Sequence, residues 1–587
     1  MSKFFLTLSL FSVIIVTNST IYPFVVGKII FFRIAVELAL LFFLIELFRN
    51  PSNFFDKVKV IFQQPIVIAV SFFVLCFLLA GIFGYDFLNS FWSNFVRGEG
   101  IFQMLHYYVF FLLLLFYLQD EGSWRKFIIY SLGTGLLMIV LGLYPWLKTY
   151  ETDSRFGGTI GNAAFASSYL LFTLFYLSYL LRSYEIRLRR ILVVGGILLT
   201  LIFLFFTGTR STFLGLVTGI SFGVIYFIFN KLKYLKNSNS NNFRNWILSA
   251  GWRIGALFGI WILIFGILLY LKPFRIFQIS LKEQTAQTRF WTWGSALKGW
   301  QEKPILGWGP ENFSEVFNKY FDERHYTQTT EVWFDRAHNT YIDYLTEAGI
   351  LGLFSYLLIW LVFYWQLFKT KIISNNERIL FFSLSIAYLA QNLLIFETLP
   401  SYINLFIFLA LASYRFSNFQ FSSFNLQSIF NKQIFNFIVI IFILVAPFSL
   451  YFGSYRPFVK SILINNALAR VSQISSAEEF KDIFSKALDY YSPYGQDEAL
   501  KMTGGVIMDL LKNPPGGGLP QEVGIVLVNF LNDRYQPTLE RGRGNNFAQN
   551  YYILGKINFV VGNKEQAKEY YETAFKLWPF RPEFIIL

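Results

Sequence analysis

Long apolar runs constrain the fold of this chain more than any other feature. Runs of about 18 to 20 predominantly apolar residues, the length that crosses the hydrocarbon core of a bilayer as a helix, recur along the 587 residues. The chain is 55% hydrophobic and its mean hydropathy is +0.47, which is more apolar than a soluble protein of this size. The sequence therefore predicts an all-α, polytopic membrane helix bundle.

The spacing of the apolar runs predicts about thirteen membrane spans. Their centres lie near residues 14, 40, 74, 109, 135, 172, 199, 220, 262, 360, 387, 408 and 445. The first run, "MSKFFLTLSLFSVIIV", lacks a small-residue cleavage site and is soon followed by a second run. We therefore expect a retained first span rather than a signal peptide.

The loops between these runs differ in charge. Alternate loops such as "RSYEIRLRR" and "KTKIISNNER" are rich in Lys and Arg, whereas "TGTRS" and "ETLPSYIN" are poorer in cations. This alternation places the N-terminus in the cytoplasm by the positive-inside rule, which also accounts for the net charge of +14 without a nucleic-acid partner. Lys28 and Arg33 do not follow the pattern, because they fall at the outer end of the second span. Arg33 is expected to pair with Glu37, four residues further along the same helix face.

Two segments are too polar to lie in a membrane. Residues 272–347 form a large loop between the ninth and tenth spans, and residues 454–587 have the composition of a soluble domain. Residues 1–453 are therefore predicted to form the transmembrane domain. An odd number of spans places both polar segments on the extracytoplasmic side.

The C-terminal segment contains the pattern of a helical repeat. Gly555, Ala567, Tyr571, Ala574 and Pro579 have the spacing of a tetratricopeptide repeat, in which small residues let two helices approach closely. An earlier stretch, "SSAEEFKDIFSKALDYYSP", carries only the second half of that pattern. We predict a small tetratricopeptide-like helical domain, which is a candidate binding site for a protein partner.

Four arginines occupy the predicted outer ends of spans. They are Arg97 in "NFVRGEGIF", Arg155 in "DSRFGGTIGN", Arg210 in "FFTGTRSTFLG" and Arg289 in "QTAQTRFWTW". Arginine keeps its charge and binds phosphate through two parallel hydrogen bonds, so several arginines that converge from different loops would suit a diphosphate. The alternative interpretation of each arginine alone is an anchor at the membrane interface.

One of the three histidines stands at the mouth of the tenth span. His338 follows Asp335 and Arg336 and precedes a long apolar helix. Histidine is the side chain best suited to move a proton near neutral pH, so His338 is the candidate general base. The alternative is that it caps the helix or bonds a backbone carbonyl. His106 and His325 are interpreted as structural.

Several of these segments resemble one known family. "RAHNTYIDYLTEAGILGLFSYL" resembles the signature of the O-antigen ligase and polymerase superfamily, in which His-Asn begins a helix that runs through Glu-x-Gly-x-x-Gly-Leu. "TRFWTWGSALKGWQEKPILGWGPENF", "FGGTIGNAAFASSYLL" and "TGTRSTFLG" are similar to its other motifs. The likeness covers most of residues 90–365. The C-terminal domain resembles that of a subgroup with helical repeats.

The resemblance implies a membrane glycosyltransferase of the GT-C type in the bacterial plasma membrane. Such enzymes pass a glycan from an undecaprenyl diphosphate donor to a hydroxyl group on the extracytoplasmic face, with inversion at the anomeric carbon. By analogy, Arg210 and Arg289 would hold the diphosphate and His338 would act as general base. The resemblance carries diphosphate binding over to Arg155 and Arg97 as well, through motifs that match the family more loosely. We find no Asp-x-Asp in the outer loops and expect no metal or other cofactor, because arginines can neutralise a diphosphate.

The acceptor is left open by the sequence. A ligase, a polysaccharide polymerase and a protein O-oligosaccharyltransferase share this chemistry and differ only in whether a lipid, a glycan or a protein receives the sugar. A transporter or flippase of lipid-linked glycan also fits the hydropathy, but it should carry polar residues through the middle of several spans. A membrane scaffold would not need the outer arginines.

Overall fold

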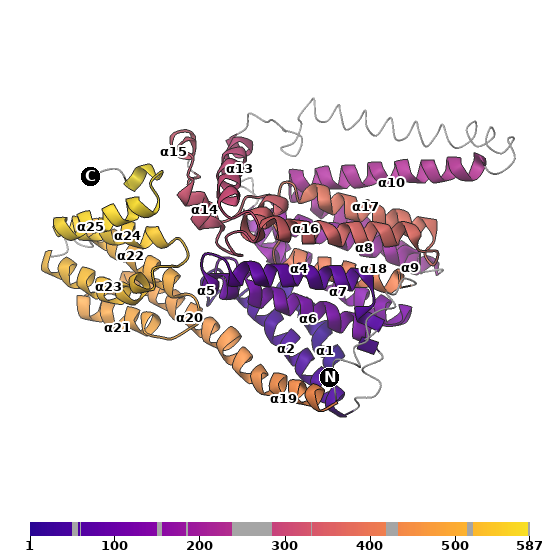
Figure 1. Ribbon diagram of the computed structural model, residues 1–587, viewed down its shortest axis with the longest axis horizontal. Helices are drawn as coiled ribbons and strands as arrows, with labels where there is room; N and C mark the ends of the chain where they lie inside the picture. The colour runs from indigo at the N-terminus through magenta and orange to yellow at the C-terminus, as the bar shows by residue number, and fades with distance from the viewer. Residues whose placement is uncertain are drawn as a thin grey trace.

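The computed structural model describes residues 1–49, 57–58, 60–149, 155–182, 186–236, 284–329, 331–417, 432–512 and 521–584. The described parts of the chain are helical and contain no strand, which confirms the all-α prediction. Figure 1 shows a bundle of roughly aligned helices and a group of C-terminal helices at one of its ends. Helices α13, α14 and α15 lie at that same end of the bundle.

The bundle is built from helices of very different length. They are α1 (Ser2–Leu8), α2 (Val26–Arg49), α4 (Pro65–Ile82), α6 (Ile101–Tyr117), α7 (Glu121–Thr149), α8 (Ala163–Leu181), α9 (Arg187–Phe206), α10 (Arg210–Lys236), α16 (Thr340–Lys369), α17 (Asn375–Gln391), α18 (Leu399–Arg415) and α19 (Lys432–Phe448). Outside it lie α5 (Phe87–Trp92), α13 (Gln284–Glu302), α14 (Phe313–Lys319) and α15 (Arg324–Gln328).

Seven helices in the described parts of the chain are long and apolar enough to cross a membrane. The thirteen spans predicted from the sequence are therefore not confirmed. Four of the predicted spans that are not among the seven fall on α2, α6, α17 and α18. Helices α6, α17 and α18 are too short, with 17 residues each, and α2 carries the charged residues Lys28, Arg33 and Glu37. The span predicted near residue 262 lies outside the described residues.

The centre of the bundle is aromatic. Every residue of α18 from Leu399 to Ser413 is buried, as expected for a helix that is apolar on all sides. The ring centroid of Phe408 lies 5.4 Å from that of Phe363 and 5.5 Å from that of Phe381. Each such pair contributes about 0.5–1.5 kcal/mol beyond its buried area. Helix α9 instead exposes Leu188, Leu192 and other apolar side chains, as a lipid-facing helix does.

The helix that follows His338 is broken, whereas the sequence predicted a continuous one. Gly349 has φ 65° inside α16, and the segment that begins at Pro304 pairs with this kink. The amide of Trp308 donates to Thr346 O at 3.0 Å, and that of Ile350 donates to Pro304 O at 2.8 Å. A Cβ on Gly349 would lie 2.2 Å from a backbone oxygen of this segment, so only glycine fits.

The predicted pair of Arg33 and Glu37 is not formed, because each side chain has other partners. Arg33 is fully buried and donates to Gln103 Oε1 at 2.8 Å and to the Tyr494 hydroxyl at 3.2 Å. Glu37 Oε1 lies 2.9 Å from His106 Nε2. Arg33 thus joins the bundle to the C-terminal helices rather than stabilising its own helix.

The C-terminal helices are α20 (Arg456–Ala469), α21 (Ala477–Leu488), α22 (Gln496–Lys512), α23 (Gln521–Arg541), α24 (Phe547–Val560) and α25 (Lys564–Leu577). Helices α24 and α25 form the pair of helices predicted from the repeat pattern. Ala567 and Ala574 are fully buried, and Gly555 lies against the Tyr571 ring. The C-terminal segment is thus helical, and its assignment as a separate domain of the tetratricopeptide class stays a prediction.

The C-terminal domain packs against the large loop. Glu315 on α14 accepts a hydrogen bond from the amide of Phe547 at 2.8 Å and from Trp578 Nε1 at 3.2 Å. The Arg581 guanidinium lies 3.9 Å from the centre of the Trp333 ring. The two polar segments therefore lie together, as the predicted topology requires. The side of the membrane that they face stays a prediction.

Candidate functional site

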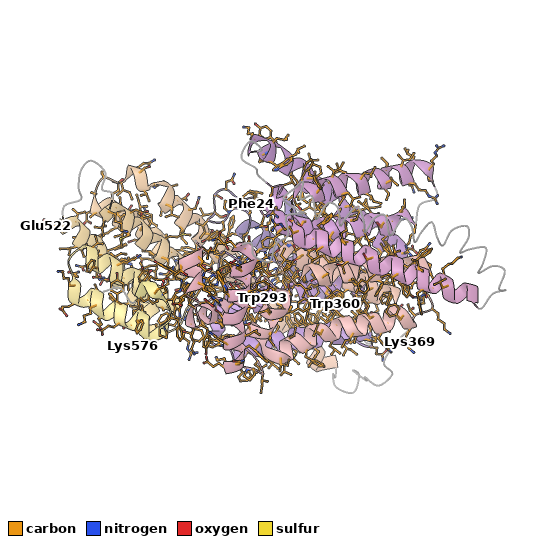
Figure 2. The ribbon with its side chains drawn as sticks, turned by 90° about the horizontal axis from the view of Figure 1, so that it is seen from above. Phe24, Trp293, Trp360, Lys369, Glu522 and Lys576 are labelled. Carbon is orange, nitrogen blue, oxygen red and sulfur yellow. The ribbon has the colours of Figure 1, made fainter. Side chains whose placement is uncertain are left out.

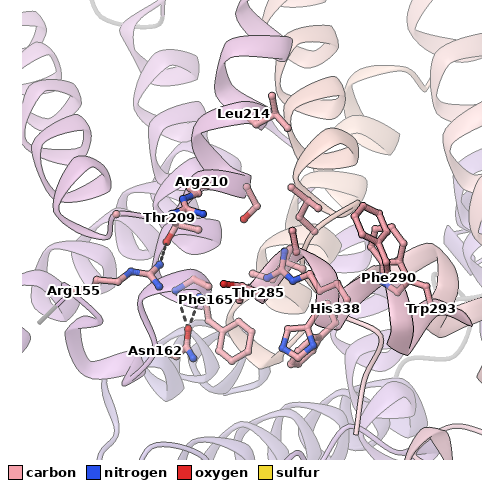
Figure 3. Close-up of a pocket in the computed structure, with 18 of the residues that line it drawn as sticks. Arg155, Asn162, Phe165, Thr209, Arg210, Leu214, Thr285, Phe290, Trp293 and His338 are labelled. Carbon is pink, nitrogen blue, oxygen red and sulfur yellow. Dashed lines mark hydrogen bonds between the residues drawn. The ribbon is translucent and has the colours of Figure 1, made fainter. Parts of the chain in front are cut away.

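A cavity of about 370 Å³ lies at the end of the bundle that faces α13. It is lined by all five residues that the sequence singled out, namely Arg97, Arg155, Arg210, Arg289 and His338. They come from segments far apart in the chain, and Figure 3 shows Arg155 and Arg210 on one side of the space and His338 on another. The structure thus brings the predicted site residues into one place.

Helices α8, α10 and α16 begin at this cavity, and the first turns of α13 line it. Helix α8 starts after Asn162, whose side chain accepts from the amides of Ala164 and Phe165. Helix α10 starts at Arg210, and α16 starts after Asn339, the residue next to His338. The N-terminal end of a helix carries a partial positive charge, so the backbone adds to the charge of the arginines. Such an arrangement favours an anionic ligand, phosphate groups above all.

The guanidinium of Arg97 forms an ion pair with the carboxylate of Asp335. Its Nε and Nη2 lie 2.6 and 2.9 Å from the two oxygens of Asp335, and its guanidinium lies 4.7 Å from the centre of the Phe396 ring. Burial acts to raise the pKa of Asp335, but Arg97 outweighs it and holds that pKa well below the usual value. Arg97 therefore fixes the segment before His338 while it lines the cavity.

Arg155 fixes the turn that precedes Arg210. Its Nε donates to Thr207 O and its Nη2 to Thr209 Oγ1, both at 2.7 Å. Between these two residues Gly208 has φ 57°, a conformation that other residues rarely adopt. Arg155 thus shapes the turn "TGT" and, through it, the start of α10 (Figure 3).

His338 stands in an unusual backbone conformation with φ 55°. The preceding residue is held on both sides, since Trp293 Nε1 donates to Ala337 O at 2.8 Å and the Ala337 amide donates to Asp343 Oδ1 at 2.6 Å. Left-handed backbone at a residue other than glycine is uncommon and gathers at functional sites. Asn339, not His338, caps α16, so the capping alternative does not hold.

The imidazole of His338 is neutral at physiological pH. Burial and then the charge of Arg289 lower its pKa to about 4, although Asp335 opposes this shift. Its Nδ1 lies 3.4 Å from the carbonyl oxygen of Arg336, too far for a strong hydrogen bond. A neutral, weakly bonded imidazole at the wall of a cavity is able to accept a proton.

A buried ion cluster supports the segment before His338. Arg336 is 6% exposed and forms ion pairs with Glu311 and with Glu347, the latter at 3.1 Å. Sequence reasoning noted Arg336 beside His338 but missed these partners, which lie 25 residues before it and 11 after it. The available signal was the charge of Arg336 shortly before an apolar helix. A charged side chain that is buried there needs an oppositely charged partner.

The other two histidines, which the sequence analysis interprets as structural, do not line this cavity. His325 is fully buried among aromatic rings, with that of Phe317 5.2 Å away, and burial lowers its pKa to about 4. His106 lies in α6 and contacts Glu37. The described residues also contain no group of three or more His, Cys, Asp or Glu side chains placed to hold a metal ion.

One comparison with known proteins gives a match. Residues 195–357 match the model of the O-antigen ligase family, which confirms the resemblance over this segment. The segment includes Arg210, Arg289 and His338 but ends before the C-terminal helices, so the subgroup with helical repeats stays a prediction. No curated protein matches the chain. The match supports a glycosyltransferase-like function for this multi-pass membrane protein.

Proposed function

We propose that the protein transfers a glycan from an undecaprenyl diphosphate donor to an acceptor hydroxyl at the extracytoplasmic face of the bacterial plasma membrane. One observation carries the proposal: four arginines and a histidine, drawn from distant parts of the chain, line a single cavity at one end of a membrane bundle. The match to the O-antigen ligase family supports the same class of reaction. The lipid tail of the donor would remain in the bilayer while its sugar enters the cavity.

Arg210 and Arg289 are proposed to bind the diphosphate. A guanidinium binds phosphate oxygens through two parallel hydrogen bonds, and Arg210 begins α10, where the helix dipole also favours an anion. Negative charge grows on the diphosphate as the bond to the sugar breaks. Positive groups that are already in place stabilise this charge more in the transition state than in the ground state. We propose that these groups act without a divalent metal ion.

His338 is proposed to act as the general base. The acceptor oxygen attacks the anomeric carbon while its proton passes to the neutral imidazole. The bond between that carbon and the diphosphate oxygen breaks, and the electron pair leaves with the lipid diphosphate. Attack from the side opposite the leaving group inverts the anomeric configuration. The left-handed backbone at His338, held by Trp293, would place the imidazole where the acceptor approaches.

The same chemistry serves a ligase, a polymerase or a protein O-oligosaccharyltransferase. Surface glycan from cells that lack the protein distinguishes them, since the three activities differ in what is lost. Loss of attached chains indicates a ligase, loss of long chains indicates a polymerase, and loss of glycosylated protein indicates the third. A flippase is less well supported, because the predicted arginines gather around one cavity.

The His338→Ala variant tests the proposal. Positioned proton transfer contributes about 10² to 10⁴ in rate, so the variant should lose transfer by roughly that factor. It should stay folded and keep its affinity for the donor, because the diphosphate is bound by other residues. Turnover and donor binding are measured with purified protein, lipid-linked donor and acceptor. Full turnover by folded His338→Ala protein would remove the general-base assignment.

A further inference from the structure

A second cavity, of about 420 Å³, lies between the large loop and the C-terminal domain. The loop contributes Glu302, Lys303, Trp308, Glu315 and Lys319, and Tyr85 lies on the same wall. Helix α24 contributes Phe547 and Ala548, α25 contributes Lys576 and Leu577, and Trp578 follows α25. Neither wall makes the cavity alone, so this space exists only because the C-terminal domain packs on the loop.

Lysines dominate the charge of this second cavity. Lys303 is half-buried, with its ammonium group 4.7 Å from the centre of the Trp308 ring. Burial lowers its pKa, and the nearby cations Lys319 and Arg543 lower it further, although Glu302 opposes them. Of the ion pairs among the described residues, none involves Lys303 or Lys576.

The two acidic residues of the second cavity offset little of this charge. Glu302 is paired with Lys319 at 2.7 Å. Burial raises the pKa of Glu315 to about 7, although the Phe547 amide and Lys501 oppose the shift, so this carboxyl is partly protonated near neutral pH. The cavity therefore keeps an excess of positive charge beside aromatic side chains. Ligand sites commonly combine mostly apolar walls with a few placed charges in this way.

Helix α13 connects the two cavities. Its first turns line the cavity at His338 with Thr285 and Arg289, and its last residue, Glu302, lines the second cavity. Arg289 and Glu302 are 13 positions apart on α13, which is about 20 Å at a rise of 1.5 Å per residue. A ligand that spans several sugar units can cover that distance.

We propose that the second cavity binds an acidic segment of a glycan chain, one that carries carboxylate or phosphate groups, while the end of that chain reacts at His338. The proposal rests on the proposed function. It gives the C-terminal domain a direct part in substrate binding, because Lys576 and Trp578 come from that domain. The apolar faces of the sugar rings match the aromatic side chains of this cavity, and the acid groups of the glycan match its lysines.

Binding of a short oligogalacturonate to the purified full-length protein tests the site. The Lys303→Gln, Lys576→Gln double variant should bind it about tenfold more weakly than wild type. The matched control, Lys564→Gln with Lys568→Gln, removes two exposed lysines of α25 outside the cavity and should bind as wild type does. A neutral dextran oligomer of equal length should bind more weakly than the acidic one. Equal binding by the two double variants would overturn the proposal, as would the absence of binding to wild type.

Transfer assays then identify the source of the glycan. A higher KM for a long acidic donor in the Lys303→Gln, Lys576→Gln variant assigns the second cavity to the donor chain, and a higher KM for a long acceptor assigns it to the acceptor. Either result supports the proposal if kcat with short substrates is unchanged. If phosphatidylglycerol vesicles displace oligogalacturonate from the protein, the second cavity is reassigned to lipid headgroups and the proposal is overturned. Binding without any transfer by wild type would contradict the proposed function alone.

Discussion

The two ends of the membrane bundle use arginine in opposite ways. At the end away from the cavity at His338, Arg182 and Arg415 share the buried carboxylate of Glu377, whose Oε1 lies 2.7 Å from Arg415 Nε. Glu121 Oε1 lies 3.7 Å from Arg182 Nη2, and Glu121 Oε2 lies 3.8 Å from Arg415 Nη1. Two positive and two negative groups therefore balance where α7, α8, α17 and α18 meet.

At the cavity end, four arginines from distant segments of the chain line one space. Among the described residues that line the cavity there is no Asp or Glu, and Asp335 meets the charge of Arg97 from outside the lining. The difference teaches that arginines which share buried carboxylates hold helices together, whereas arginines that line a cavity are placed to bind an anion.

The largest expected effect on the transfer rate comes from replacing a single arginine at the cavity, and a single arginine at the opposite end of the bundle serves as the comparison. The Arg210→Gln variant should lower kcat/KM by about 10² to 10³, as the loss of one group that stabilises transition-state charge does. Arg210→Lys should not restore it, because an ammonium lacks the guanidinium fork. The matched change Arg415→Gln should instead lower thermal stability and leave turnover per folded molecule unchanged. Transfer rates and melting temperatures of the variants give both readouts. Equal losses of activity at the two ends would break the comparison.

A smaller effect is expected in the pH dependence of transfer. Because the pKa of His338 is lowered to about 4, kcat/KM of wild type should stay constant from pH 8 to pH 5 and fall as His338 becomes protonated near pH 4. Arg289 lowers this pKa, so Arg289→Gln should raise it and move the acidic fall to higher pH. The shape of the profile reports this shift even where the variant is slower. A wild-type profile that falls near pH 6.5 would show an unperturbed histidine.

The site residues were predictable because their signals are local. Arg97, Arg155, Arg210 and Arg289 each lie at the end of an apolar run, and His338 directly precedes one. A charge at bilayer depth is unfavourable, so charges at the ends of spans stand out in a sequence. The alternation of loops then predicts that these ends share one face, and the structure places all five residues at one cavity.

Contacts between distant segments were not predictable. The sequence cannot show that Asp335 binds Arg97, 238 residues earlier, or that Arg33 turns away from Glu37 toward Tyr494. The kink at Gly349 likewise depends on the segment that begins at Pro304, which packs beside it and supplies backbone partners. Local propensity favours a continuous helix there, and tertiary packing overrides it.

Binding of a prenyl diphosphate tests the central claim most directly. The account predicts that purified wild-type protein binds farnesyl diphosphate more tightly than farnesyl monophosphate. The Arg210→Gln, Arg289→Gln double variant should bind the diphosphate about 10 to 100-fold more weakly than wild type. Each hydrogen bond to a charged group contributes about 1.5–3 kcal/mol at most, and solvent recovers part of this free energy. The control Arg182→Gln, at the opposite end of the bundle, should bind as wild type does. Equal affinity of the double variant and the control for the diphosphate would contradict the account.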